Sequence, residues 1–321
     1  MSVYIAGTGS YLPKKVMTND ELAKMIDTSD EWIVSHTGIR SRHIADQHES
    51  CSILGIEAAR RALVSAGVAP EDVGLVVLAT SSPDYVAFPA TACIIQNALG
   101  IPNAMAFDVS AGCTGFVTAL DIARNMMAND PRPSLVVCSE VMSRIIDWTD
   151  RNTCPLFGDG AAAVVLKCGE STSGLRKSYF RSEGSGAGTL YRGGGSKLRE
   201  DGTSLLTPLY MQGKAVFNFA VKAVEEAVLK VLERNDITAD EIKLIVPHQA
   251  NFRILDAAAR RMNIPVEKFF MNIEHIANTS SASIPIALDE LVQKGQVVKG
   301  DKLLFVAFGA GLVIGGIYVE F

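Results

Sequence analysis

The chain has 321 residues, of which 48% are hydrophobic and 20% are charged, so it can bury a large core and is too apolar to be disordered. Its net charge of −5 excludes a general attraction to nucleic acid or to anionic membrane, because either partner requires a clustered basic surface. The first residues lack the pattern of a secretory signal, and no apolar stretch approaches the roughly 20 residues that span a bilayer. We therefore expect a cytoplasmic globular protein.

The first half of the chain alternates predicted helices with predicted strands. After a short strand over residues 3–6, capping boxes at residues 18–21 and 28–31 each open a short helix. Residues 75–78 form an uninterrupted apolar run, which is typical of a parallel strand buried on both faces. The other predicted elements are helices over about 52–65, 90–99 and 113–127 and extended segments over 104–109, 135–138 and 161–166.

The second half repeats this order. It has predicted helices over about 213–233, 251–262 and 282–293 and extended segments over 244–246, 269–273, 303–307 and 312–319. Residues 75, 113 and 134 correspond to residues 243, 281 and 302, a constant offset of 168 that suggests an internal duplication. We expect two α/β halves, residues 1–172 and 173–321, joined within residues 169–213 by a glycine- and serine-rich surface loop.

Two glycine-rich segments resemble nucleotide sites without meeting their requirements. No helix opens after Gly7-Thr8-Gly9, so the dinucleotide fingerprint fails, and residues 193–197 lack the Gly-Lys-Ser/Thr order of a phosphate loop. The five histidines and six cysteines show no metal-ligand spacing or disulfide framework. We therefore expect free thiols, no metal and no bound cofactor.

Cys113 is the strongest candidate for a reactive residue. It lies where an extended segment turns into a helix, between Gly112 and Thr114-Gly115. Unpaired backbone N–H groups and the helix dipole at such a position stabilise a thiolate, and small neighbours let a substrate carbonyl approach the backbone. The other five cysteines are interpreted as core residues.

His248 and Asn278 are candidate partners of this thiol. His248 follows the apolar residues 244–246, and Asn278 precedes the helix predicted over 282–293. Sites in parallel α/β sheets form at the carboxyl ends of strands, so we expect the three side chains to meet there. The other histidines, His36, His43, His48 and His275, have polar neighbours that favour exposed or packing roles.

With Cys113, His248 and Asn278 in this order, the chain resembles the β-ketoacyl-acyl carrier protein synthase III family of the thiolase-like superfamily. The likeness covers nearly the whole chain. It rests on Arg40 and on residues 7–13, 27–33, 149–151, 157–160, 246–251 and 308–311. Other condensing classes pair the cysteine with two histidines, or with a histidine and a second cysteine. The resemblance implies a layered αβαβα architecture built from two duplicated halves.

The resemblance also implies an activity, the initiation of fatty-acid synthesis by decarboxylative condensation. Cys113 would accept the acyl group of an acyl-coenzyme A primer, with backbone N–H groups of Cys113 and Ala310 holding the oxyanion. His248 and Asn278 would then stabilise the enolate formed from a malonyl group on acyl carrier protein. Coenzyme A would act as a substrate carrier, and family members are homodimers.

Further residues acquire roles only through the resemblance. Coenzyme A would contact Trp32, Arg151 and Asn251; the primer would contact Phe88, Met142 and Phe157, with Phe88 reaching the partner subunit's site; and an acidic carrier protein would dock on Arg253, Arg260 and Arg261. Each also has a structural interpretation, as a core aromatic, an ion-pair partner, a helix cap or a solvated helix face.

The sequence departs from the family at two positions, and three alternative functions remain open. His36 stands where many members have an arginine near coenzyme A, and Asn218 where some have a lysine near the entrance. The enzyme could instead serve a specialised polyketide or signal-molecule pathway, or the chain could be a non-catalytic acyl-binding scaffold. A papain-like hydrolase fits less well, because its cysteine signature is absent. Primer length and branching are not determined by these motifs.

Overall fold

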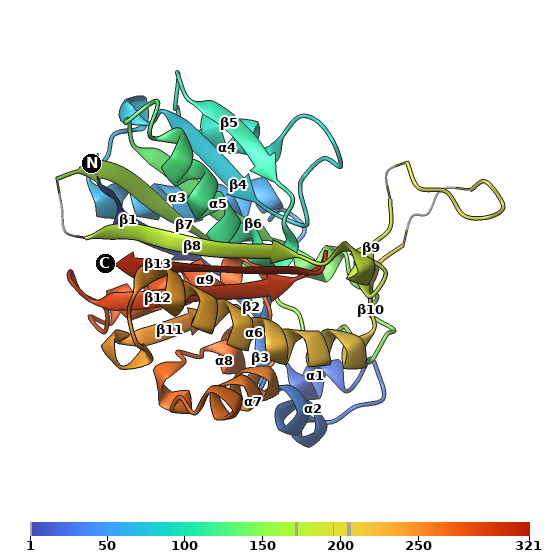
Figure 1. The fold of residues 1–321 in the computed structure, drawn as a ribbon. Coiled ribbons are helices and arrows are strands. Elements are labelled where there is room, and N and C mark those ends of the chain that lie inside the picture. Colours follow the sequence, from blue (N-terminus) through green and yellow to red (C-terminus); the bar gives the residue numbers. More distant parts are fainter. Residues whose placement is uncertain (1, 171–172, 195, 204–206) are drawn as a thin grey trace.

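Two mixed β-sheets form the framework of the protein (Figure 1). The computed structural model describes residues 2–170, 173–194, 196–203 and 207–321. The first sheet has the order β1 (Ser2–Tyr11), β7 (Gly160–Gly169), β6 (Ser134–Glu140), β4 (Leu75–Ala79) and β5 (Met105–Val109). The second has the order β8 (Gly174–Ser182), β13 (Val313–Glu320), β12 (Lys302–Gly309) and β11 (Leu244–Pro247).

The two sheets repeat one pattern of strand directions. In the first sheet, β7 pairs antiparallel with both β1 and β6, and β6 then pairs parallel with β4. In the second sheet, β13 pairs antiparallel with both β8 and β12, and β12 then pairs parallel with β11. The counterpart of β5 is a single parallel bridge between Ile245 and Phe269. This agreement supports the predicted duplication; residue 172, at the predicted boundary, lies outside the described residues.

Helices form three layers around the sheets. The bounds are α3 (Cys51–Ala66) and α4 (Thr91–Ala98) on the first sheet, α5 (Gly115–Met126) and α9 (Ser283–Gln293) between the sheets, and α6 (Gly213–Asn235) and α7 (Phe252–Met262) on the second. The buried residues of α5 and α9 join strands of both sheets in one core. The five layers match the predicted αβαβα order, and no helix of the described chain is long and apolar enough to cross a membrane.

Smaller elements lie around one end of the two sheets. They are α1 (Asn19–Leu22), α2 (Asp30–Thr37), α8 (Ile273–Ile276), the ribbon of β2 (Lys15–Thr18) with β3 (Ser41–Ile44), and the ribbon of β9 (Leu190–Arg192) with β10 (Leu209–Met211). The capping box at Thr18 and Glu21 is confirmed. The second predicted box is wrong, because Ser29 rather than Thr28 caps α2 and accepts a hydrogen bond from the Trp32 N–H.

Two extended or loop predictions are also wrong. Residues 269–273 form no strand, since only Phe269 pairs and α8 begins at Ile273. Residues 169–213 are not simply a surface loop, because they contain β8, β9 and β10. The polar sequence Arg176-Lys177-Ser178 conceals β8, whose Tyr179 and Phe180 pack into the cores on opposite faces of the second sheet.

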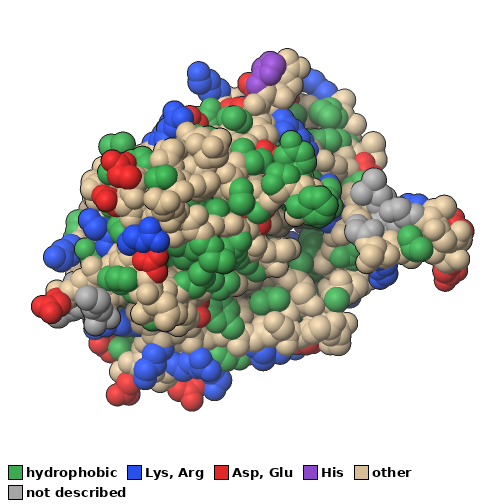
Figure 2. Space-filling model, turned by 90° about the horizontal axis from the view of Figure 1, so that it is seen from above, with side chains coloured by type: hydrophobic (Ala, Val, Ile, Leu, Met, Phe, Trp, Pro, Cys, Tyr) green, Lys and Arg blue, Asp and Glu red, His purple; other side chains and the backbone are tan. Residues whose placement is uncertain are grey.

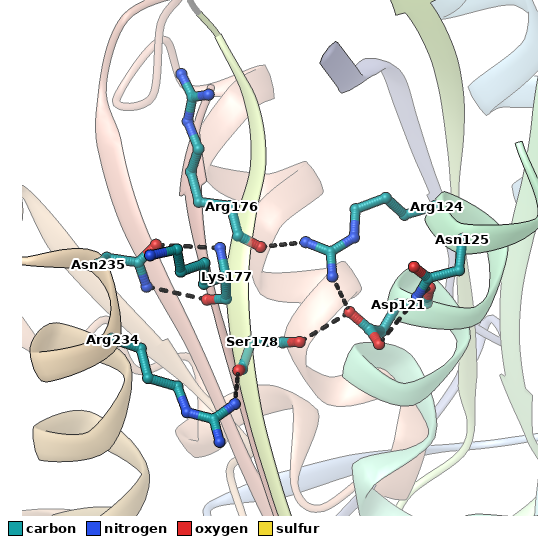
Figure 3. A network of polar contacts seen from close by, with 8 residues as sticks. All are labelled: Asp121, Arg124, Asn125, Arg176, Lys177, Ser178, Arg234 and Asn235. Carbon is teal, nitrogen blue, oxygen red and sulfur yellow. Dashed lines mark hydrogen bonds and ion pairs between the residues drawn. The ribbon is translucent and has the colours of Figure 1, made fainter. Parts of the chain in front are cut away.

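Polar contacts attach β8 to two helix layers (Figure 3). The Ser178 hydroxyl donates to Asp121 of α5 over 2.8 Å, and the Arg234 guanidinium of α6 donates to the Ser178 carbonyl over 2.6 Å. Arg124 of α5 also donates to the Arg176 carbonyl. These contacts explain how a polar edge strand is held between the central and outer helices.

Gly9 shows how closely β1 approaches α3. A Cβ atom at Gly9 would lie 2.4 Å from the Ala62 nitrogen and 2.6 Å from the Ala58 oxygen, which are backbone atoms that cannot rotate away. We expect Gly9→Ala to lower the free energy of unfolding by about 3 kcal/mol, the upper range of overpacking. Urea unfolding followed by circular dichroism tests this. The control is Gly188→Ala, where a Cβ meets nothing within 4 Å, and equal stabilities of the two variants would contradict the prediction.

Candidate active site

A cavity of about 560 Å³ lies at the carboxyl ends of the central strands. Cys113, His248 and Asn278 all line it, so the structure brings together the three side chains predicted to meet. Most of the remaining wall is apolar. Its apolar side chains include those of Met142, Ile145, Leu156, Phe157, Leu209, Met211, Val216, Phe217, Ile254 and Phe308. Such a wall excludes water and strengthens the few polar contacts within it.

Cys113 lies in a tight turn directly ahead of a helix. The turn η2 (Gly112–Thr114) follows β5 and leads into α5. A Cβ atom at Gly309 would lie only 3.0 Å from the Cys113 Cβ and 3.1 Å from its nitrogen, so the backbone of Gly309-Ala310 passes directly against the thiol residue. This approach requires glycine and places the backbone of residues 309–310 beside any acyl group on Cys113.

The thiol of Cys113 does not have the low pKa expected from its position before a helix. Burial raises its pKa to about 11, opposed by a contact of 3.5 Å between its Sγ and the Ser280 Oγ. A thiolate among apolar side chains would lose its hydration, and this cost raises the pKa. The thiol is therefore protonated at neutral pH.

His248 is buried and neutral. Burial lowers its pKa to about 3, since a charged ring would lose its hydration in this apolar wall. Its Nδ1 lies 2.8 Å from the Ser283 Oγ at the start of α9, and its ring meets Phe308 edge to face at 5.2 Å between centroids. These contacts fix the ring plane and leave Nε2 for contact with a ligand.

The orientation of the Asn278 amide is determined by its neighbours. Its Oδ1 accepts a hydrogen bond from the Ser280 N–H over 2.8 Å, and a backbone N–H can only donate. The Nδ2 group must therefore point the other way, and among the described residues it donates to no protein acceptor. Asn278 thus offers a donor to the cavity, as His248 does when its proton is on Nε2.

Trp32 and Asn251 line the mouth of the cavity, and Arg151 lies beside Trp32. The Arg151 guanidinium lies 5.4 Å from the Trp32 ring centroid and pairs with Asp27 over 3.1 Å. Asn251 caps α7, accepting from the Arg253 N–H and donating to the His36 carbonyl. The structural interpretations of Arg151 and Asn251 thus also hold, as ion-pair partner and helix cap. His36, predicted to be exposed or packing, stacks on Trp32 at 4.4 Å and lines the cavity.

The three residues predicted for the primer pocket are not together. Met142 and Phe157 line the cavity and are almost fully buried. Phe88 is 85% exposed and does not line the cavity of its own chain. Cys93 is also exposed, which corrects its interpretation as a core residue.

The three predicted docking arginines differ in their partners. Arg260 pairs with Asp256 over 2.8 Å and Arg261 with Glu225 over 2.7 Å. Arg253 lines the cavity mouth, and within the described chain no carboxylate pairs with it. Asn218 of α6 is absent from the cavity wall, which limits the significance of its departure from the family.

Sequence reasoning missed the contribution of residues 190–214 to the cavity. Leu190, Tyr191 and Arg192 of β9, Leu209 and Met211 of β10, and Gly213 and Lys214 at the start of α6 all line it. The rings of Tyr191 and Tyr210 contact each other across the ribbon in a tilted arrangement, with 5.1 Å between centroids. Alternating apolar residues at 209–211 are the only sequence signal, and a three-residue strand is too short to recognise from it.

Comparison with known proteins finds relatives over nearly the whole chain. Residues 107–184 match the family model described as 3-oxoacyl-[acyl-carrier-protein (ACP)] synthase III, and residues 232–321 match the model of its C-terminal part. The chain is 48% identical over 313 residues to a β-ketoacyl-[acyl-carrier-protein] synthase III of Caldanaerobacter subterraneus, covering 96% of this chain and 94% of the relative.

Solved structures agree. The 3-oxoacyl-[acyl-carrier-protein] synthase III of Aquifex aeolicus is 42% identical, with a TM-score of 0.92 over 99% of this chain and 100% of that chain. The corresponding synthase of Thermus thermophilus is 41% identical, with a TM-score of 0.94 over 99% of both chains. These likenesses confirm the predicted thiolase-like fold.

The raised pKa of Cys113 makes its reactivity testable. We expect iodoacetamide to alkylate Cys113 slowly near neutral pH and faster as the pH rises toward about 11, because only the thiolate reacts. Mass spectrometry of digests taken across the pH range gives the rate, and glutathione alkylated in parallel calibrates the reagent. A rate that levels off below about pH 8, near the pKa of an unperturbed thiol, would contradict this.

Proposed function

The chain belongs to the β-ketoacyl-[acyl-carrier-protein] synthase III family, and on that premise we propose how its residues carry out the family's reaction. The chain is an acyltransferase that initiates fatty-acid synthesis by condensation. The family implies an acyl-coenzyme A and a malonyl-acyl carrier protein as its substrates, and membership excludes the papain-like alternative. The observation that carries the proposal is the meeting of Cys113, His248 and Asn278 in one apolar cavity.

In the first step, Cys113 takes the acyl group from coenzyme A. The Sγ atom attacks the thioester carbonyl, the carbon–sulfur bond to coenzyme A breaks, and the thiol proton passes to the coenzyme A sulfur. Because burial keeps the free thiol protonated, this proton leaves as the new bond forms rather than beforehand. The backbone N–H groups of Cys113 and Ala310 hold the oxyanion, which the close approach of Gly309 to Cys113 supports.

In the second step, the malonyl group loses carbon dioxide, and the enolate carbon that remains attacks the acyl carbonyl carbon on Cys113. The bond between that carbon and the Cys113 Sγ breaks, the β-ketoacyl thioester stays on the carrier protein, and the released thiolate takes a proton from solvent. His248 Nε2–H and the Asn278 amide donate to the thioester oxygen, on which the enolate charge develops. This role requires the neutral form of the His248 imidazole, and burial keeps the ring neutral. For Nε2 to carry the proton, the Ser283 hydroxyl donates to Nδ1, 2.8 Å away, in place of the Ser280 carbonyl at 3.1 Å.

The mouth of the cavity holds the two carriers. Trp32 and Arg151 enclose the coenzyme A adenine, and Asn251 lies along the pantetheine arm. An intercalated ring needs about 7 Å between its neighbours, so Arg151 moves away from the Trp32 ring, which its exposure allows. Arg253 of α7 and Lys214 of α6 are cations at the mouth that can contact an acidic carrier protein. Arg260 and Arg261 lie further along α7.

The location of the enzyme is part of the same proposal. All six cysteines are free thiols, and Cys93 is exposed, which suits a reducing compartment such as the cytoplasm.

A homodimer is proposed through β5, the loop before α4, and α4 itself. β5 is the edge strand of the first sheet, and Tyr85, Val86, Phe88 and Met105 of this region are more than half exposed. Figure 2 looks down on the top of the molecule as drawn in Figure 1, the side on which β5 and α4 lie. Hydrophobic side chains gather across this face. Pairing of two such edges covers them, and Phe88 then reaches the primer pocket of the partner subunit.

The acyl-enzyme is the central intermediate of the proposal. We expect incubation with a panel of acyl-coenzyme A thioesters to add the mass of one acyl group to the wild-type chain, as intact-mass spectrometry measures it. Cys113→Ala should gain no mass, whereas Cys168→Ala, which removes a partly exposed thiol of β7 outside the cavity, should gain it fully. No gain with any donor, or an equal gain in Cys113→Ala, would overturn the role of Cys113.

A positive charge introduced at the edge of β5 tests the proposed dimer. Size-exclusion chromatography with light scattering should give twice the chain mass of 34.3 kDa for the wild type. Met105→Arg should shift the mass toward a single chain, because a buried unpaired cation opposes association. Val64→Arg, at an exposed valine of α3, should leave the dimer intact. A wild type of single-chain mass would refute the dimer.

A further inference from the structure

Glu140 is a fully buried carboxyl group with no role in the steps above. It is the last residue of β6, at the cavity end of the first sheet, and its side chain has no exposure to solvent. In the described structure no lysine, arginine or histidine pairs with it, and burial raises its pKa. A buried carboxyl without a cation is costly, so its surroundings must hold it through hydrogen bonds.

Each carboxyl oxygen of Glu140 binds a different half of the protein. Oε2 accepts hydrogen bonds from the Ser81 N–H over 3.0 Å and from the Ser82 hydroxyl over 2.8 Å, both in the turn after β4. Oε1 accepts from the Ser281 hydroxyl over 2.6 Å and from the Ser281 N–H over 3.4 Å, in the turn η7 (Ser280–Ala282) before α9. Glu140 therefore links two turns that are about 200 residues apart in the chain.

Both turns reach the reaction site. Ser81 and Ser280 line the cavity, and the Ser280 Oγ lies 3.5 Å from the Cys113 Sγ. Ser281 packs against the start of α5, where a Cβ atom at Gly115 would lie 2.9 Å from the Ser281 Cβ. Ser280 also has a φ of 49°, a left-handed conformation that a serine keeps only when its surroundings hold it.

We propose that Glu140 is a positioning residue for the reaction at Cys113: by binding Ser81 and Ser281 together, it fixes the two turns that form the cavity floor. This inference rests on the proposed role of Cys113 as the acyl acceptor. Glu140 touches neither substrate nor Cys113 through a hydrogen bond, and it acts through the two turns. Its charge also adds to burial in raising the pKa of the Cys113 thiol.

Glutamine at residue 140 weakens the link to one of the two turns. Each carboxyl oxygen accepts from a backbone N–H, that of Ser81 or that of Ser281. The amide of glutamine has only one oxygen, so its NH2 group must face one of these N–H donors. Aspartate keeps the charge but is shorter by one methylene, so it keeps the electrostatic effect on Cys113 and loses contacts with one turn.

The test separates geometry from charge with two readouts. The first is the rate at which a saturating acyl-coenzyme A acylates the protein, together with the KM for that thioester. We expect Glu140→Gln and Glu140→Asp to slow acylation about tenfold or more with little change in KM, because the residues at the mouth are untouched. The second is the pH midpoint of Cys113 alkylation by iodoacetamide, which should fall by about one unit in Glu140→Gln and stay at the wild-type value in Glu140→Asp.

Asp289→Asn is the matched control. Asp289 is another buried carboxyl that bridges the halves, accepting from the Thr8 and Ser10 hydroxyls over 2.7 and 2.6 Å, and it does not line the cavity. Its variant should lose stability but keep the wild-type acylation rate and alkylation midpoint. If Asp289→Asn changed the acylation rate and the alkylation midpoint as much as the Glu140 variants do, Glu140 would have only a general structural role. That result would overturn the proposal.

The outcomes also separate this inference from the proposed function. Wild-type acylation rates in both folded Glu140 variants overturn the positioning role while leaving Cys113 as acyl acceptor. If the glutamine variant does not fold, the aspartate variant alone decides, since slow acylation at an unchanged midpoint supports the proposal and wild-type acylation refutes it. If the wild type itself takes no acyl group, the proposed function fails and this inference fails with it, whereas alkylation still reports the effect of Glu140 on the thiol.

Discussion

The site depends on the close packing of the start of α5 against the turn η7, which precedes α9, between the two sheets. Both helices begin at the cavity end, each after a three-residue turn, η2 or η7. Small side chains allow this approach, because anything larger than glycine at residue 115 would strike Ser281. Further along, Phe116 and Phe305 fill the core between the sheets with ring centroids 5.7 Å apart. Since a packed interior resists deformation, the turns that carry Cys113 and Ser280 are held as firmly as the core itself.

The two sheets share one pattern of strand directions, but residues at equivalent positions of the two halves differ. At the offset of 168 residues, Cys113 corresponds to Ser281, Thr80 to His248 and Glu140 to Phe308. In the second half, the aromatic ring of Phe308 packs on His248, whose burial lowers the pKa of the imidazole. In the first half, the carboxyl group at the equivalent position gathers hydroxyl and N–H donors instead. Equivalent positions thus hold an aromatic ring beside His248 in one half and a carboxyl group that contacts both halves in the other.

Burial has opposite effects on the two titratable groups of the site but the same consequence. It raises the pKa of the Cys113 thiol and lowers that of the His248 imidazole, so both groups are uncharged at neutral pH. Thioester exchange and decarboxylation each develop negative charge on one oxygen and discharge it within the same reaction. In the proposed mechanism a site of neutral donors is therefore sufficient, because backbone N–H groups, an imidazole and an amide would stabilise that charge without a permanent counterion.

Local patterns predicted most of the fold and the meeting of Cys113, His248 and Asn278 in one cavity, because each depends on neighbours in sequence. The apolar run before His248, the glycines around Cys113 and the cap of α1 are signals of this kind. The pKa of Cys113, by contrast, depends on side chains brought from both halves, so the local expectation of a stabilised thiolate was wrong. β8 was missed because its strand pairing with β13, rather than its own polar sequence, stabilises it. Glu140 has a visible signal, an acidic residue directly after an apolar strand, but its partners Ser81 and Ser281 become neighbours only when the halves pack together.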